Sequence, residues 1–400
     1  MMVLSERAKN VTASLTLAIS AKAKQMQKSG EEVIIFGAGE PDFDTPAFIK
    51  QAGISAIEDG FTKYTPASGI IELKEAVVAK FRKDNNLDYT ATQIIISCGA
   101  KHSLYVCLQA ICNPQDEVII FSPYWVSYPE MIKLAGAIPV IVNTKEEDGF
   151  LPAISSIKAA VSNKTKLIVI NSPCNPTGIV YPKELLEEIG QIAVKNDLGI
   201  ISDEIYEKII FDSKKHVSCA SGGEDIKSRT IVVNGVSKTY AMTGWRIGYL
   251  AGSVEVVKAM SSIQSHSTSN PNSIAQKAAL AALKNEDQEA TSMAAEFQTR
   301  RDFIVERLKR INGVSFCKPE GAFYLFLNIG SFLGCKLGKR VVGNSLDFAN
   351  YLLEEAKVAV VPGVAFGADN YIRISFAASM EDLSHGLDRM ETAMRKINSA

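Results

Sequence analysis

The chain has 400 residues, of which 46% are hydrophobic and 22% charged, a composition typical of a globular protein with two or three domains. Its 43 lysines and arginines nearly balance 44 aspartates and glutamates, so the overall charge favours neither nucleic acid nor an anionic membrane as a partner. The first thirty residues lack the apolar core of a signal peptide, and no apolar run is long enough to span a bilayer. These features predict a soluble protein.

The cysteines and histidines of the chain predict neither a disulfide framework nor a metal site. The seven cysteines are odd in number and lie mostly within apolar runs, unlike a disulfide framework. This distribution favours the reducing cytoplasm. The four histidines show no paired ligand spacing, so the sequence predicts no metal site.

Short β-branched runs alternate with helical patterns through the first two thirds of the chain, after an N-terminal segment of about forty residues that fits neither pattern and is expected to form an arm. The alternation predicts an α/β fold with a mostly parallel central sheet flanked by helices on both faces. Strands are predicted at 93–97, 117–121, 138–142, 166–170, 198–202, 230–234 and 247–251, and amphipathic helices at 104–111 and 183–195.

The pattern changes near residue 273. Residues 273–311 are alanine-rich, charged and free of proline, which predicts one long helix; 334–344 resemble an exposed loop, 364–375 a strand, and the chain ends in a helix. The change predicts a second, smaller α+β domain. We expect residues 1–45 to form the arm and part of the small domain, 46–290 the large domain, and 291–400 the small C-terminal domain.

Ligands of open parallel sheets collect at the carboxyl ends of the strands, so the residues that follow each strand are candidates for a site. The strand at 93–97 leads into Gly99, Ala100 and Lys101 at a helix start, where backbone N–H groups can hold a phosphate. The strand at 117–121 leads to Trp125, whose ring can stack on a flat ligand. Taken alone, core packing is the more ordinary explanation of this tryptophan.

Three further strand ends carry polar groups. Asn175 follows the strand at 166–170 in a proline-rich turn, and Asp203 and Tyr206 follow the strand at 198–202. A carboxylate at the end of an apolar strand costs free energy unless it is paired or caps the next helix. Lys238 and Arg246 follow 230–234. A buried lysine amine forms Schiff bases with carbonyl compounds, although most lysines are surface charges.

The candidates describe one chemistry when they are combined. A Schiff-base lysine, an acidic partner for a pyridinium nitrogen, a stacking ring and a phosphate cradle are what pyridoxal phosphate requires of a protein. Competing nucleotide motifs are incomplete, because the stretch from Gly37 to Gly39 lacks the third glycine of a dinucleotide fingerprint and no P-loop sequence occurs.

Ordered motifs run through almost the whole chain, namely Gly39-Glu-Pro-Asp-Phe-Asp, Lys63-Tyr64-Thr with Gly69, Ser122-Pro-Tyr-Trp125-Val-Ser-Tyr, Asn175-Pro-Thr-Gly178, Ser202-Asp203-Glu-Ile-Tyr206, Ser237-Lys238 with Gly244-Trp-Arg246, Gly321-Ala-Phe-Tyr324 and Arg373-Ile-Ser. With these motifs the chain resembles the class I aminotransferases of fold type I. Within that family it resembles the bacterial and plastid subgroup of aspartate and prephenate aminotransferases.

The resemblance implies pyridoxal 5'-phosphate as cofactor, bound covalently by Lys238 in the large domain. It further implies that Asp203 pairs with the pyridine nitrogen, that Tyr206 and Asn175 hydrogen-bond the phenolic oxygen, and that Trp125 stacks on the ring. The phosphate is expected at the start of the helix after 93–97 and at Arg246, with Tyr64 contributed by the partner subunit of a homodimer whose active sites are shared. The full set implied to hold the cofactor is Tyr64, Gly99, Ala100, Lys101, Trp125, Asn175, Asp203, Tyr206, Ser237, Lys238 and Arg246.

The same resemblance implies how a substrate is bound. Arg373 is expected to bind the α-carboxylate through two parallel hydrogen bonds, assisted by Gly39, Asn175 and Trp125. Lys101, with Ser14 and Thr16, is expected to meet the distal carboxylate of a dicarboxylic substrate. A helix-start lysine that points to solvent explains Lys101 about equally well.

The implied reaction is reversible transfer of the amino group from L-aspartate to 2-oxoglutarate, giving oxaloacetate and L-glutamate by ping-pong kinetics. Lys238 acts as proton carrier, with Asp203 and Tyr206 as the other catalytic groups. Prephenate or a broader substrate range ranks second, because members that accept prephenate usually carry Lys-Pro-Ser where this chain has Thr12-Ala13-Ser14.

Two other classes of function remain open at this point. A lyase of the same fold would share the cofactor residues, although Lys101 disfavours it. A regulator that senses the cofactor would carry a basic DNA-binding domain ahead of the aminotransferase-like part, where this sequence has an arm of roughly forty residues.

Overall fold

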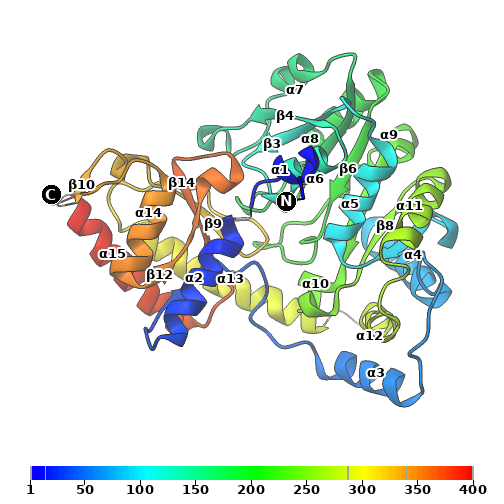
Figure 1. Ribbon diagram of the computed structural model, residues 1–400, viewed down its shortest axis with the longest axis horizontal. Coiled ribbons are helices and arrows are strands. Elements are labelled where there is room, and N and C mark those ends of the chain that lie inside the picture. Colours follow the sequence, from blue (N-terminus) through cyan, green and yellow to red (C-terminus); the bar gives the residue numbers. More distant parts are fainter. Residues whose placement is uncertain (1, 14, 286–287, 338–339, 399–400) are drawn as a thin grey trace.

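The computed structural model describes residues 2–13, 15–285, 288–337 and 340–398. Most of the fold is built around two sheets of unequal size (Figure 1). The larger sheet has seven strands in the order β2-β8-β7-β6-β5-β3-β4, all parallel except β8, which runs antiparallel to both neighbours. Its strands are β2 (Ile94–Ser97), β3 (Glu117–Ser122), β4 (Ile138–Asn143), β5 (Thr165–Asn171), β6 (Gly199–Asp203), β7 (Thr230–Gly235) and β8 (Gly248–Ala251).

Helices cover both faces of this sheet because alternate strand residues point to opposite sides. Ile95 of β2 packs in a core under α5, α6 and α11, whereas Ile94 and Ile96 pack in a core on the other face, under α4 and α12. Farther along that second face, β3, β5 and β6 pack under α7, α8 and α9. These helices are α4 (Ile71–Asn85), α5 (Ala100–Ile111), α6 (Ser127–Leu134), α7 (Ile154–Ala160), α8 (Lys183–Lys195), α9 (Glu224–Arg229), α11 (Val254–Ser267) and α12 (Ser273–Lys284), with α3 (Ala47–Glu58) against α12.

A smaller antiparallel sheet, in the order β13-β14-β9, forms a second centre. Its core includes side chains from the N-terminal helix α2, and β1 pairs with β12 at its side, so residues from both ends of the chain build it. The elements are α2 (Leu15–Lys28), β1 (Ile34–Ile35), α13 (Gln288–Leu308), β9 (Tyr324–Asn328), α14 (Ser345–Tyr351), β12 (Val358–Ala359), β13 (Val361–Pro362), β14 (Tyr371–Ser375) and α15 (Met380–Asn398).

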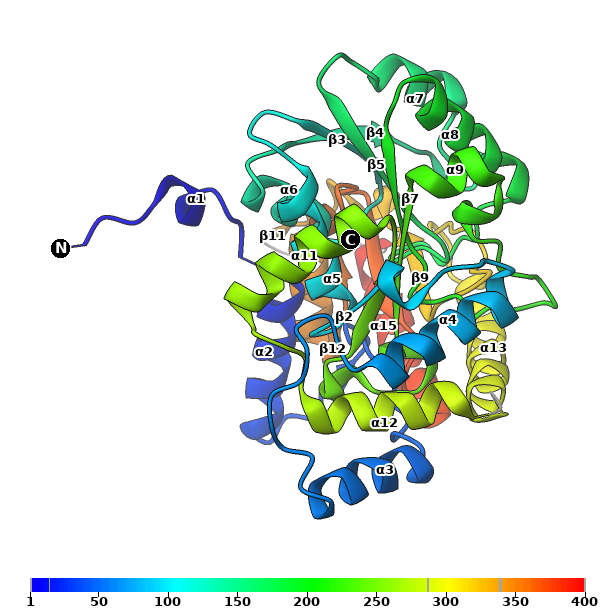
Figure 2. The ribbon, with the colours of Figure 1, turned by 90° about the vertical axis from the view of Figure 1, so that its right-hand side faces the viewer.

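Two short elements lie outside these cores. The helix α1 (Glu6–Lys9) extends away from the rest of the molecule at the N-terminus (Figure 2). The strands β10 (Lys336–Leu337) and β11 (Arg340–Val341) pair antiparallel within the segment 334–344, which was predicted to be a loop. No helix in the described ranges is long and apolar enough to cross a membrane.

The prediction of an α/β fold with a mostly parallel sheet is confirmed, and each predicted strand of the large sheet ends within one residue of the observed bounds. The predicted single helix over 273–311 is wrong. The chain forms α12 and α13 instead, because α12 packs against α3 and α4 whereas α13 packs in the core of the small sheet. The predicted strand over 364–375 is also wrong in its first half, where residues 363–366 form a helical turn and β14 begins at Tyr371.

The domain boundaries stay a prediction. The association of α2 and β1 with the small sheet is compatible with assigning residues 1–45 partly to the small domain, 46–290 to the large domain and 291–400 to the small domain.

Candidate active site

A cavity of about 640 Å³ lies where the carboxyl ends of the parallel strands meet residues of α2, β9 and β14. Of the residues predicted from the sequence, it is lined by Thr16, Gly39, Ala100, Lys101, Trp125, Asn175, Asp203, Tyr206, Ser237, Lys238, Arg246 and Arg373. Gly99 lies beside the lining residues, Tyr64 is 89% exposed and does not line the cavity, and Ser14 lies outside the described residues.

Lys238 lies on α10 (Val236–Thr239), the short helix that follows β7, and its Nζ donates a 2.5 Å hydrogen bond to the carbonyl of Gly39. Burial lowers the pKa of Lys238 to about 8; the negative charge of Glu40 opposes this, and Arg373 and Arg246 add to the lowering. The amine is therefore substantially unprotonated in mildly alkaline solution, as a nucleophile or proton acceptor must be.

Asp203 ends β6 and is 4% exposed. Its Oδ1 accepts from the backbone N–H of Ile205 at 3.3 Å and its Oδ2 from the hydroxyl of Tyr128 at 2.7 Å. The turn that follows is not a helix, so the alternative role as a helix cap does not apply. Burial raises the pKa of Asp203 to about 6, and the Tyr128 hydrogen bond offsets part of that rise. The result is a buried carboxylate that is still mostly ionised at neutral pH.

Arg373 extends from β14 toward the large sheet and is almost fully buried. Its Nη1 donates to Asn175 Oδ1 at 2.9 Å and its Nη2 to the carbonyl of Gly37 at 3.0 Å, while the guanidinium lies over the ring of Tyr324, 4.3 Å from the centroid. Its buried Nε has no partner among the described residues. A guanidinium held in a fixed orientation in the lining of a cavity is suited to binding a carboxylate.

Tyr206 and Asn175 are held in place by neighbours that have no predicted role. The hydroxyls of Tyr206 and Tyr324 lie 2.9 Å apart. Asn171 accepts from the backbone N–H of Asn175 at 2.8 Å and donates to the carbonyl of Asp203 at 3.0 Å. The ends of β5 and β6 are therefore tied together directly beneath the cavity.

The junction between β2 and α5 forms a close contact with Arg246. Gly99 has φ +91°, and a Cβ at this position would lie 2.3 Å from Arg246 Nη2. Arg246 itself adopts the left-handed conformation and donates to the carbonyls of Thr243 at 2.8 Å and Cys98 at 3.3 Å. The first N–H groups of α5 and this guanidinium thus lie next to each other, which favours an anion.

Lys101 lies on the first turn of α5, and its Nζ is 4.9 Å from the centroid of the Trp125 ring. It lines the main cavity and also a neighbouring one of about 720 Å³. Thr16 lies in α2 with a buried hydroxyl that has no partner among the described residues. A cation therefore lines this end of the site, whereas the Thr16 hydroxyl is shielded from the cavity.

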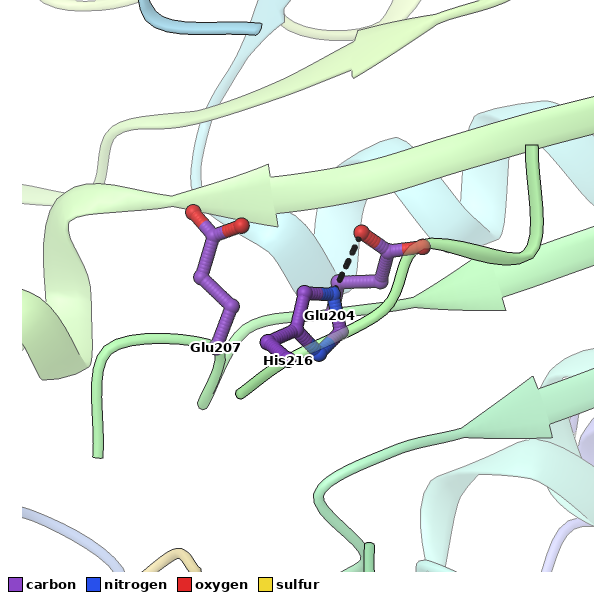
Figure 3. Close-up of side chains that lie close together, drawn as sticks. All are labelled: Glu204, Glu207 and His216. Atoms are coloured by element: carbon purple, nitrogen blue, oxygen red, sulfur yellow. Dashed lines mark hydrogen bonds and ion pairs between the residues drawn. The ribbon is translucent and has the colours of Figure 1, made fainter. Parts of the chain in front are cut away.

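A second group of ionisable residues lies behind the turn that carries Asp203 and Tyr206. The carboxylates of Glu204 and Glu207 and a ring nitrogen of His216 lie within 4.8 Å of one another (Figure 3). The sequence spacing of the histidines did not predict this cluster, because its members come together only through the turn.

Both carboxylates of the cluster already have protein partners, whereas the buried Nδ1 of His216 has none among the described residues. Glu204 accepts from Ser218 at 2.7 Å and contacts His216 Nε2 at 2.9 Å, which is the dashed contact in Figure 3. Glu207 forms an ion pair with Lys80. Since Lys80 already pairs with Glu207 and hydroxyls already donate to Glu204, we interpret the cluster as buried polar contacts that hold the turn in place.

The cavity residues that received no role from the sequence include Glu40, Tyr128 and Tyr324. Each lies inside a motif by which the resemblance was identified, but the motif alone does not indicate which way the side chain points. The contacts of Glu40 with Thr243, at 2.7 Å, and of Tyr128 with Asp203 join segments far apart in sequence.

Comparison with known proteins agrees with this geometry. The sequence model of the family "Aminotransferase class I and II" matches residues 31–390. The aspartate aminotransferase of Bacillus subtilis is 47% identical over 395 residues, covering 99% of this chain and 100% of the relative. A probable aspartate/prephenate aminotransferase of Rickettsia felis is 47% identical over 400 residues, covering 100% of this chain and 98% of the relative.

Solved structures resemble the whole chain. The aspartate aminotransferase of Rhizobium meliloti has a TM-score of 0.95 at 39% identity and covers 99% of this chain and 100% of its own. The aspartate aminotransferase of Thermus thermophilus with maleate has a TM-score of 0.91 at 43% identity, with coverage of 98% and 100%. The likeness therefore includes both sheets and the cavity between them.

Proposed function

Because the chain belongs to the class I and II aminotransferases, we propose that it transfers the amino group of L-aspartate to 2-oxoglutarate with pyridoxal 5'-phosphate as cofactor. The observation that carries this proposal is the meeting of Lys238, Asp203 and Arg373 in one cavity. The curated relatives named aspartate aminotransferase, at 47% and 46% identity, support the choice of substrate over a lyase reaction.

The residues present fit this cofactor on three grounds. Lys238 supplies an amine whose pKa is lowered to about 8, Asp203 supplies a buried carboxylate, and a Cβ at Gly99 would fill the space beside Arg246 where a phosphate would be held. When bound, pyridoxal phosphate withdraws the electron pair that remains on the substrate Cα after its proton is lost.

Lys238 has two tasks in the proposed reaction. Its Nζ is the group that would hold the cofactor covalently, and the same Nζ, once freed by the substrate amine, would take the proton from the substrate Cα. The lowered pKa suits both tasks, since each needs the unprotonated amine. Asp203 would oppose the positive charge of the pyridine nitrogen, and Tyr206 and Asn175 would hydrogen-bond the phenolic oxygen.

Arg373 is proposed to bind the substrate α-carboxylate with Asn175 and the backbone of Gly39. Its place in the cavity lining and the orientation fixed by Asn175 and Gly37 support this role. Lys101 and Thr16, which also line the cavity, are proposed to bind the distal carboxylate. Maleate, the ligand of the Thermus thermophilus structure, is likewise a dicarboxylate.

A homodimer is part of the proposal. Tyr64 is 89% exposed on its own subunit, as expected for a residue that completes the partner's phosphate site. Amino and keto acids are the substrates of this family. The seven free thiols are compatible with the cytoplasmic location proposed from the sequence.

Prephenate is a second candidate substrate because five relatives are named probable aspartate/prephenate aminotransferases. The lysine charge that is missing at Thr12 keeps it in second place. In this structure the backbone N–H of Thr12 donates to Glu130 at 2.9 Å, and Thr12 lines the neighbouring cavity.

A steady-state panel tests the proposed function, with aspartate, glutamate, tyrosine and alanine as donors and oxaloacetate, 2-oxoglutarate and prephenate as acceptors. We expect aspartate with 2-oxoglutarate to have the highest kcat/KM. In Lys101→Ala, loss of a charge-assisted contact should lower kcat/KM for aspartate by about 10- to 100-fold and leave alanine nearly unchanged.

The matched control is Lys24→Ala, which removes another exposed cation from the same cavity lining. It should affect aspartate much less than Lys101→Ala does. Equal losses for aspartate and alanine in Lys101→Ala would refute the distal-carboxylate role, and a preferred donor other than aspartate would refute the substrate assignment.

A further inference from the structure

Tyr128 connects two residues to which the proposed function gives cofactor contacts. It lies in the first turn of α6, lines the cavity and is 4% exposed. Its ring packs edge-on against Trp125, with centroids 5.3 Å apart and an interplanar angle of 83°. Its hydroxyl donates a 2.7 Å hydrogen bond to Asp203 Oδ2.

We propose that Tyr128 is a positioning residue, whose hydroxyl keeps Asp203 ionised and fixes the orientation of its carboxylate toward the pyridine nitrogen. This inference rests on the proposed function, because it assumes that Asp203 is the partner of that nitrogen. It adds a residue from α6 to a site that the strand ends alone do not complete.

The orientation follows from the two hydrogen bonds of the carboxylate. The Ile205 N–H holds Oδ1 from the same turn, at 3.3 Å, and the Tyr128 hydroxyl holds Oδ2 from a different element at 2.7 Å. Donors on both oxygens resist rotation about the Cβ–Cγ bond. Without the shorter of them, only the weaker backbone contact would remain.

The ionisation follows from the surroundings of Asp203. Burial favours the neutral acid and raises the pKa of Asp203, whereas a hydrogen bond donated to the carboxylate favours the ionised form. The ionised form is needed because a neutral Asp203 would not attract a pyridinium. The titratable groups that face this carboxyl are Tyr128, Cys174, Glu204, Tyr206 and Lys238. Of these five side chains, Tyr128 is the hydrogen-bond donor to the carboxylate.

Tyr128 is suited to be a constant donor. Burial and the adjacent carboxylate raise its pKa well above the usual value of a phenol. The hydroxyl therefore keeps its proton over the whole pH range in which an aminotransferase is assayed, so its hydrogen bond to Asp203 does not switch off.

Tyr128→Phe removes this hydrogen bond and keeps the ring that packs on Trp125. We expect the dissociation constant of pyridoxal 5'-phosphate, measured on cofactor-free enzyme between pH 5 and 9, to rise about tenfold or more near neutral pH. The acid limb of the binding profile is the low-pH range in which binding weakens as Asp203 becomes protonated. It should move to higher pH by about one to two units, because a hydrogen bond to a charged carboxylate lowers its pKa by roughly that amount. The thermal midpoint should change little.

The control is Tyr181→Phe, which removes a hydroxyl from another buried tyrosine, one that packs against Phe121 on the far side of the strands. Its binding profile should coincide with that of the unmodified protein. Asp203→Asn is the reference: it should abolish the acid limb. If Asp203→Asn leaves the dissociation constant unchanged, the cofactor role of Asp203 in the proposed function is refuted, and this inference with it.

If Asp203→Asn weakens binding but Tyr128→Phe gives the profile of the unmodified protein, the inference alone is refuted. Placing 3-fluorotyrosine at position 128 alone gives a second test that does not depend on the folding of the Phe variant. Its more acidic phenol is a stronger donor, so the acid limb should move to lower pH; a move to higher pH, or none, would contradict the positioning role.

Discussion

The environment of Lys238 distinguishes it from the many surface lysines of this chain. Its amine is held by the Gly39 carbonyl at the edge of a cavity that also contains Arg373 and Arg246, and burial lowers its pKa to about 8. None of this can be read from the sequence around the residue. There, only the resemblance to a family distinguishes Lys238 from a solvated charge.

A pH prediction follows for the cofactor-free enzyme. Below pH 8 most Lys238 is protonated and cannot attack the aldehyde of pyridoxal 5'-phosphate; above pH 8 most of it is free amine. The second-order rate constant of covalent capture, followed by stopped-flow absorbance, should therefore rise about tenfold per pH unit below 8 and level off above it. Lys238→Ala should show no covalent capture.

An ordinary lysine, with a pKa of about 10.4, would give a rate that continues to rise beyond pH 9.5. Such a profile would contradict the account of Lys238, provided that the enzyme remains folded by circular dichroism over the same range.

At the scale of elements, the junction from β2 into α5 depends on a residue without a side chain. Gly99→Ala would force a Cβ into the left-handed region, at a cost of about 1 kcal/mol, and against the guanidinium of Arg246. Because that guanidinium is proposed to hold the phosphate, we expect affinity for pyridoxal 5'-phosphate to fall at least as much as stability does, by about tenfold or more.

Gly30→Ala is the matched control. Gly30, just after the end of α2, has φ +88°, nearly the same φ as Gly99, but a Cβ at this position would meet nothing within 4 Å. Its thermal midpoint should fall similarly while the cofactor dissociation constant, measured by fluorescence titration, is unchanged. Equal affinity losses in both variants would mean that backbone strain, and not contact with Arg246, is responsible.

The elements themselves were largely predictable, and the failures have physical causes. Buried parallel strands are continuous apolar runs, so the seven strands of the large sheet were located from local pattern. The break between α12 and α13 was missed because alanine-rich, charged sequence favours helix throughout, whereas the chain must leave one core and enter another. Helix propensity is a local property and does not indicate which core a helix packs against.

At the scale of the whole molecule, the cavity unites residues that are separated by up to 357 positions, from Thr16 to Arg373. The rule that ligands bind at the carboxyl ends of parallel strands selected Asn175, Asp203 and Lys238. It has no means of selecting Thr16 or Arg373, which reach the cavity from α2 and β14; these came from the resemblance. The roles of Tyr128 and Glu40 required the three-dimensional contacts.

The central claim is that this cavity transfers an amino group from aspartate by way of Lys238. A single-turnover experiment tests it most directly: enzyme loaded with pyridoxal 5'-phosphate is mixed with aspartate in the absence of any keto acid. Ping-pong chemistry predicts about one oxaloacetate per active site, further turnover only when 2-oxoglutarate is added, and no oxaloacetate from Lys238→Ala. Absence of oxaloacetate in the unmodified enzyme, or an equal yield from Lys238→Ala, would contradict the account.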